Sequence, residues 1–154
     1  TGEELFPPVV KGPGEYMAVA TREDVNFSGS GGTWDFGPLT DTTGLKSLKN
    51  FMMECNNFDG KFEGNWDLSQ VTDMESAFMG CRSMTTAEGM GDWDVSNITN
   101  MFFLFFQCAA FNADLSKWCV SKIPSDNTGG GSAWEDENKP VWGTCPRGED
   151  GSNP

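Results

Sequence analysis

The sequence predicts an α/β solenoid of about three stacked strand–helix units at residues 45–123, between irregular arms at residues 1–44 and 124–154. Two observations predict this fold class. A nine-residue pattern that begins at Trp66 begins again at Trp93 in the central block, and all eight prolines lie outside that block. The length of 154 residues suits one domain.

The N-terminal arm, residues 1–44, is predicted to be extended because it holds four prolines and eight glycines. It also contains Trp34, an aromatic residue that needs a surface on which to dock. We therefore expect this arm to clamp onto another surface.

The central block repeats itself in order. Residues 66–74, Trp-Asp-Leu-Ser-Gln-Val-Thr-Asp-Met, return at 93–101 as Trp-Asp-Val-Ser-Asn-Ile-Thr-Asn-Met, and a shorter copy follows at 118–123. The alternation of Trp66 with Leu68 predicts a short buried strand. Equivalent positions would place Trp66, Trp93 and Trp118 in one parallel sheet. Their indoles are expected in the core rather than on a platform for sugar rings.

A short helix is predicted after each strand. Val71, Met74 and Phe78 are spaced by three and then four residues, as on one face of a helix, and Thr72 with Glu75 forms a capping-box pair. A strand and a short helix in each of several successive copies make the unit of a leucine-rich-repeat-like solenoid.

This pattern, followed by Phe-x-x-Cys-x-x-Phe-Asn-x-Asp-Leu at residues 105–115, resembles the BspA-type leucine-rich repeats of surface proteins from bacteria, protists and algae. The resemblance covers roughly residues 45–123. It implies a secreted or surface-displayed solenoid used for adhesion or partner binding, with no family catalytic residues to carry over.

Composition excludes several function classes. The net charge of −13 disfavours nucleic-acid binding, which depends on Lys and Arg, and the absence of histidine removes His-based catalysis and His metal sites. No stretch approaches the roughly 18 apolar residues that membrane insertion needs. We expect no enzyme activity and no cofactor.

Two aspartates form the weak candidate for a metal site. Asp67 and Asp94 occupy equivalent positions one repeat apart and are expected on the outer side of the sheet, where they could share Ca²⁺. A solvated face is the preferred interpretation, because no general base or dense ligand spacing accompanies them.

The five cysteines divide into two groups. Cys55, Cys81 and Cys108 recur at the same place in successive copies, which predicts a buried column of reduced thiols. Cys119 replaces the aspartate of the other copies, so it is expected to face outward. We predict that it forms a disulfide with Cys145, stapling the C-terminal arm to the last repeat.

The expected interface lies in the run 101–106, Met-Phe-Phe-Leu-Phe-Phe, which is too apolar for one face of a helix. Phe102, Phe103 and Phe106 must lie against an arm of the chain or against a neighbouring subunit. Trp134 and Trp142, in the C-terminal arm, are expected to dock in the same way as Trp34.

These features favour a non-catalytic, extracellular or surface-associated module that binds another protein. One alternative is an accessory structural subunit of a larger assembly, such as a virion, an appendage or a membrane complex. A second alternative is a glycan-binding adhesin.

Overall fold

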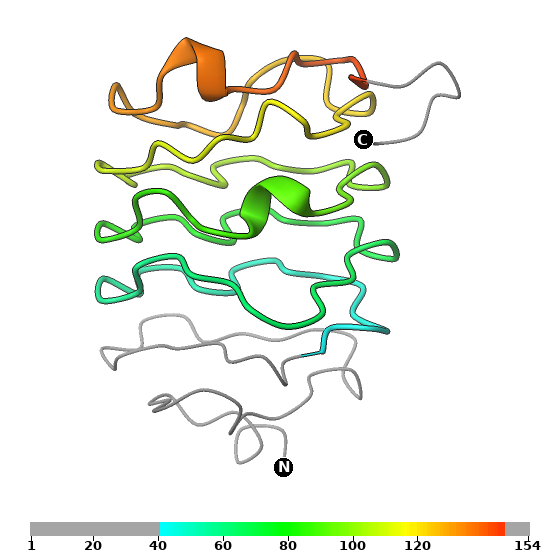
Figure 1. The fold of residues 1–154 in the computed structure, drawn as a ribbon, viewed down its shortest axis with the longest axis horizontal. Helices are drawn as coiled ribbons and strands as arrows, with labels where there is room; N and C mark the ends of the chain where they lie inside the picture. The colour runs from blue at the N-terminus through cyan, green and yellow to red at the C-terminus, as the bar shows by residue number, and fades with distance from the viewer. Residues whose placement is uncertain (1–40, 147–154) are drawn as a thin grey trace.

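The computed structural model describes residues 41–146, which form a stack of chain turns lying one above another (Figure 1). The predicted α/β solenoid is wrong. Within residues 41–146 the regular elements are two short 3-10 helices, η1 (Met90–Asp92) and η2 (Asp136–Asn138). The parallel pairings are isolated bridges rather than strands: Asp41 with Asn65, Ser47 with Asp73, and Asp73 with Asn100. The fold is mostly irregular coil.

Where short helices were predicted, the chain makes two consecutive four-residue turns. We call residues 48–55, 74–81 and 101–108 the first, second and third turn pairs. In each turn the fourth N–H donates to the first carbonyl, as from Phe51 to Leu48 at 3.0 Å. The third residue of every turn has a positive φ, which is typical of type II turns. These residues are Asn50, Glu54, Ser76, Gly80, Phe103 and Gln107.

Backbone hydrogen bonds link each turn pair to the next. The N–H of Leu48 donates to Asp73 at 2.8 Å, that of Ser76 to Phe102 at 2.9 Å, and that of Phe103 to Asn127 at 2.9 Å. Alternate N–H groups along each turn pair donate in this way, always toward the C-terminal neighbour, so buried amides find partners without a sheet or helix. Equivalent positions therefore line up in columns.

The core runs along the inside of the stack. The first and fourth residues of each turn point inward and are buried, including Leu48, Phe51, Met74, Phe78 and Phe105. The rings of Phe78 and Phe105 stack at 6.4 Å between centroids, and the Phe51 ring meets that of Phe78 at 5.9 Å. The apolar residues that were expected on one face of a helix are therefore the first and fourth residues of successive turns.

The sheet predicted through Trp66, Trp93 and Trp118 is not present, because no bridge joins these residues in the part of the chain that the structure describes. Their expected place in the core is nevertheless observed. Trp93 and Trp118 are buried, and Trp66 packs partly buried against Trp93 with centroids 5.4 Å apart. Trp118 Nε1 donates to the carbonyl of Met90 at 2.9 Å.

Residues 124–146 lie over the third turn pair and the chain that follows it (Figure 1). The N–H of Leu115 donates to Asn138, and that of Val120 to Thr144 at 2.9 Å. No helix in residues 41–146 is long and apolar enough to span a bilayer. The predicted N-terminal arm falls outside the described residues, apart from its last four.

Candidate functional site

The turn pairs give the molecule one surface that differs from layer to layer. The second and third residues of each turn project away from the core, and we call the surface that they form the turn face. Hydrogen bonds from each turn pair to the next bring equivalent residues into columns. The columns are Lys49, Glu75 and Phe102; Asn50, Ser76 and Phe103; Met53, Met79 and Phe106; and Glu54, Gly80 and Gln107.

Three phenylalanines occupy the turn face of the third turn pair. The rings of Phe102 and Phe103 stack with centroids 4.1 Å apart, and those of Phe103 and Phe106 with centroids 4.6 Å apart. Gly129 lies against Phe106, and a Cβ on that glycine would come within 3.1 Å of the Phe106 side chain. Phe102 is nevertheless 44% exposed. We call Phe102, Phe103 and Phe106 the phenylalanine patch.

The fold does not require aromatic residues at these positions. The same columns hold Lys49 and Asn50 in the first turn pair, and Glu75 and Ser76 in the second. Phe103 has φ 58°, in the left-handed region where a bulky side chain is unfavourable by about 1–2 kcal/mol. Strain and exposed apolar area at one place are typical of a functional surface.

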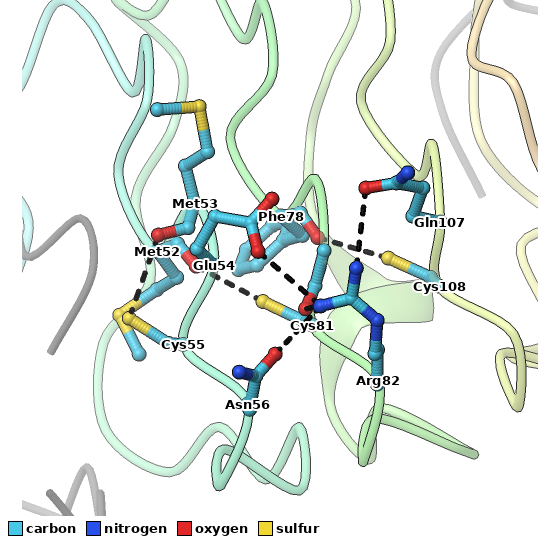
Figure 2. Close-up of polar contacts among 11 residues, drawn as sticks. Met52, Met53, Glu54, Cys55, Asn56, Phe78, Cys81, Arg82, Gln107 and Cys108 are labelled. Atoms are coloured by element: carbon cyan, nitrogen blue, oxygen red, sulfur yellow. Dashed lines mark hydrogen bonds and ion pairs between the residues drawn. The ribbon is translucent and has the colours of Figure 1, made fainter. Parts of the chain in front are cut away.

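Arg82 joins the turn pairs at the edge of this surface (Figure 2). Its guanidinium donates to Glu54 Oε1 at 3.2 Å, to Asn56 Oδ1 at 2.9 Å and to Gln107 Oε1 at 3.3 Å. It therefore connects the first and third turn pairs across the second. A Cβ on Gly80 would lie 2.7 Å from the Glu54 carboxylate, so the glycine leaves space for this ion pair.

The cysteine column is buried behind the same turns (Figure 2). Cys55, Cys81 and Cys108 are buried and reduced, as predicted. Cys81 Sγ donates to the Met52 carbonyl at 3.0 Å, and Cys108 Sγ to the Phe78 carbonyl at 2.9 Å. Burial, with the neighbouring Cys108 and Cys55, raises the pKa of Cys81, and burial raises the pKa of Cys108 to about 12. Both thiols are protonated and unreactive near neutral pH.

Asp67 and Asp94, the weak calcium candidates, each close a local turn. Asp67 Oδ1 accepts from Ser69 N at 3.0 Å and Ser69 Oγ at 2.6 Å, and Asp94 does the same with Ser96. The Ser69 hydroxyl is the main cause that lowers the pKa of Asp67. No group of three or more potential metal ligands occurs in residues 41–146. The chemistry visible at these carboxylates is turn formation.

The cysteines outside the column form the predicted disulfide, between Cys119 and Cys145. The expectation that Cys119 faces outward is wrong, because it is 5% exposed. The chain has no strand there to alternate sides, so Cys119 and its neighbours Trp118 and Val120 are all buried.

The predicted interface residues occupy two kinds of place in the structure, the core and the turn face. Trp134 is buried, its indole Nε1 donates to Ala113 O at 2.9 Å, and its ring meets those of Phe105 and Phe111 edge on. Trp142 is half-buried against the core, whereas Trp34 lies outside the described residues. The three phenylalanines, unlike these tryptophans, are together on the turn face.

Sequence reasoning missed Arg82, Met53 and Met79 as parts of this surface. Met53 and Met79 are half-buried and occupy the column of Phe106, so they extend the apolar surface toward the N-terminal side of the stack. The alignment of the repeats contained this signal, because Met53, Met79 and Phe106 occupy equivalent positions in it. The prediction of short helices did not place these residues together on one surface.

Comparison with known proteins gives one family. A family model described as "Mycoplasma protein of unknown function, DUF285" matches residues 23–128, more than half of the chain. It is not a leucine-rich-repeat family, so the suggested relationship to BspA-type repeats is corrected. No curated protein and no solved structure matches the chain.

Proposed function

Because the chain belongs to the DUF285 family, whose description assigns no function, we propose a function from its geometry: a non-catalytic module that binds another protein through the turn face. The observation that carries this proposal is the phenylalanine patch. Its rings are stacked and partly exposed, and one of them occupies a backbone conformation that disfavours it.

The neighbouring turn pairs show which residues the fold accepts at the positions of the phenylalanine patch. Polar residues at the positions equivalent to Phe102 and Phe103 form the same turns with the same hydrogen bonds within each turn, so neither folding nor stacking accounts for aromatic residues there. Aromatic side chains provide large contact area at low entropic cost, and they dominate the energetics of protein interfaces. Their replacement should therefore affect binding far more than folding.

An extracytoplasmic location forms part of the proposal. The disulfide between Cys119 and Cys145 supports it, because such bonds persist mainly in oxidising environments.

A random peptide library displayed on phage, selected against the immobilised full chain, tests the binding function. Selected peptides would be titrated by fluorescence anisotropy against three proteins: the wild type, F102Q/F103N and V141S. The double variant removes two rings without changing charge. Val141 is a matched control, because it is 68% exposed but lies outside the turn pairs.

We expect affinity to fall at least about tenfold in F102Q/F103N, equivalent to about 1.4 kcal/mol, and to remain unchanged in V141S. Circular dichroism would confirm that both variants fold. Selected peptides that bind F102Q/F103N as tightly as the wild type would show that the turn face is not the binding surface.

A further inference from the structure

We infer that the phenylalanine patch receives a basic protein segment that also carries apolar side chains. This inference rests on the proposed function and identifies the chemistry of the partner. Its first requirement is apolar contact, because Phe102 exposes 44% of its surface and stacks on Phe103.

Charge excludes two occupants that the chain itself could supply. A second copy would bring a net charge of −13 toward the same charge. Residues 1–40 carry two basic and six acidic side chains, so this segment is also acidic. Like charges brought together across an interface cost several kcal/mol, which disfavours both as partners.

Carboxylates lie in the layers on both sides of the patch. The N–H of Ser76 donates to the Phe102 carbonyl, which places Glu75 beside the patch on one side. The N–H of Phe103 donates to Asn127, which places Asp126 on the other. A cationic side chain between them would meet negative charge and the electron-rich face of a phenyl ring, and each interaction favours it.

Lys49, on the turn face, and Arg82, at its edge, already have acidic partners. Lys49 lies 3.9 Å from Glu75, and Arg82 lies 3.2 Å from Glu54. Both pairs are solvent-accessible and therefore weak, and Lys49, at 3.9 Å, offsets the charge of Glu75 only in part. Asp126 Oδ1 accepts from the N–H and hydroxyl of Thr128, which are neutral donors and leave its charge in place. Residues 41–146 as a whole carry 15 acidic and seven basic side chains, which attract a basic segment from a distance.

Three synthetic peptides of equal length would test the inference. They share the same Trp and Leu positions and carry Lys, Gln or Glu at all others. Affinity would be measured by fluorescence anisotropy on the full chain at low, physiological and high NaCl. Two charge-only changes, E75Q and D126N, would be combined as one variant. The glutamine of E75Q keeps an oxygen for Asn100, and the asparagine of D126N keeps one for Thr128.

We expect the Lys peptide to bind at least about tenfold more tightly than the Gln peptide, with the Glu peptide weakest. This preference should shrink as salt rises, because exposed charges are screened. It should fall about threefold or more in E75Q/D126N, and binding of all peptides should weaken in F102Q/F103N.

The outcomes separate the two proposals. Equal binding of the Lys and Gln peptides, lost in F102Q/F103N, would overturn the basic partner and leave the turn face as a binding surface. Undiminished binding of the Lys peptide to F102Q/F103N would reveal non-specific attraction to an acidic protein and overturn the inference. Tighter binding of cellohexaose than of any peptide, dependent on Phe102, would identify a glycan site and overturn both.

Discussion

At the scale of single residues, the third position of each turn makes a specific demand on the backbone. Six such positions have positive φ, and their occupants include Asn50 and Gly80, residue types that tolerate this region. Glu54, Ser76 and Gln107 also adopt it, and Phe103, with φ 58°, is the aromatic residue among the six. The stability of the fold and the chemistry of the turn face therefore compete at one residue.

Replacing Phe103 by Asn should change stability little. Relief of the left-handed conformation is worth about 1–2 kcal/mol. The ring stacks on both Phe102 and Phe106, and each contact is worth about 0.5–1.5 kcal/mol, so the two effects nearly cancel. We expect the free energy of unfolding of F103N, measured in urea, to stay within about 1 kcal/mol of the wild type. F103A is the control, because it loses the ring without gaining a residue suited to positive φ, and it should be less stable than F103N. If F103N were the less stable of the two, the strain argument would be wrong.

The buried thiols should resist modification. The pKa of Cys108, raised to about 12 by burial, leaves about one molecule in 10,000 as thiolate at pH 8. We expect iodoacetamide to label Cys55, Cys81 and Cys108 slowly in the native protein and completely in urea, as measured by mass spectrometry. Rapid native labelling of Cys81 would contradict the buried column.

At the scale of elements, the turn pair explains why the sequence favoured a helix. Inward residues occur at the first and fourth positions of consecutive turns, so Met74, Ala77, Phe78 and Cys81 show spacings of three, one and three. A helix face contains the same spacings. A longer stretch of sequence distinguishes this fold from a helix. Buried residues recur at every third position through Cys81, Met84, Ala87 and Met90.

The repeat itself and the cysteine pairing were readable from the sequence because both depend on position alone. Cys119 and Cys145 stood out as the cysteines outside the column, and they are bonded. Hydrogen bonds between layers were not readable. They join residues one layer apart, such as Leu48 and Asp73, and leave no local pattern of side chains.

Aspartate-x-serine turns recur along the stack and make it sensitive to acid. The Ser69 hydroxyl and N–H lower the pKa of Asp67, so their contribution to stability is present above the ordinary aspartate pKa and is lost as the pH falls below about 4. We expect S69A to be less stable than the wild type at pH 7, by less than about 1 kcal/mol because the pair is exposed.

That difference between S69A and the wild type should begin to close as the pH falls below about 4, and it should vanish only below the lowered pKa of Asp67 in the wild type, where the carboxyl is protonated in both proteins. Urea unfolding at a series of pH values measures it. S121A is the matched control, because Ser121 holds the same repeat position but follows Cys119 in place of an aspartate. A pH-independent difference for S69A would assign its effect to something other than the carboxylate.

At the scale of the whole molecule, the stack has a direction and therefore two unlike ends. The N–H groups of its turn pairs donate toward the C-terminal neighbour, so the layer after the third turn pair needs other acceptors for its own donors. Thr128 N donates to Asp126 Oδ1, and Gly130 N to Thr128 Oγ1. Side chains thus replace the missing next layer, which discourages a second copy from pairing there.

The disulfide completes this end of the stack, and its removal should loosen residues 124–146. It links cysteines 26 positions apart, which corresponds to a constraint of about 3.5 kcal/mol in the chain-entropy account. Within residues 124–146 the one regular element is the short helix η2, and Trp142 is half-buried. We expect C119S/C145S to lose about 2–4 kcal/mol in urea unfolding, with a red shift of tryptophan fluorescence as Trp142 gains solvent.

Reduction provides the control for this prediction, because the thiols of Cys55, Cys81 and Cys108 are already reduced. Dithiothreitol should therefore lower the stability of the wild type to that of C119S/C145S and should leave the variant unchanged. A wild type that keeps its stability after reduction would show that packing of Trp134 against Phe105 and Phe111 holds the end of the stack without the bond. A variant that reduction destabilises further would show that a second bond exists among the buried cysteines.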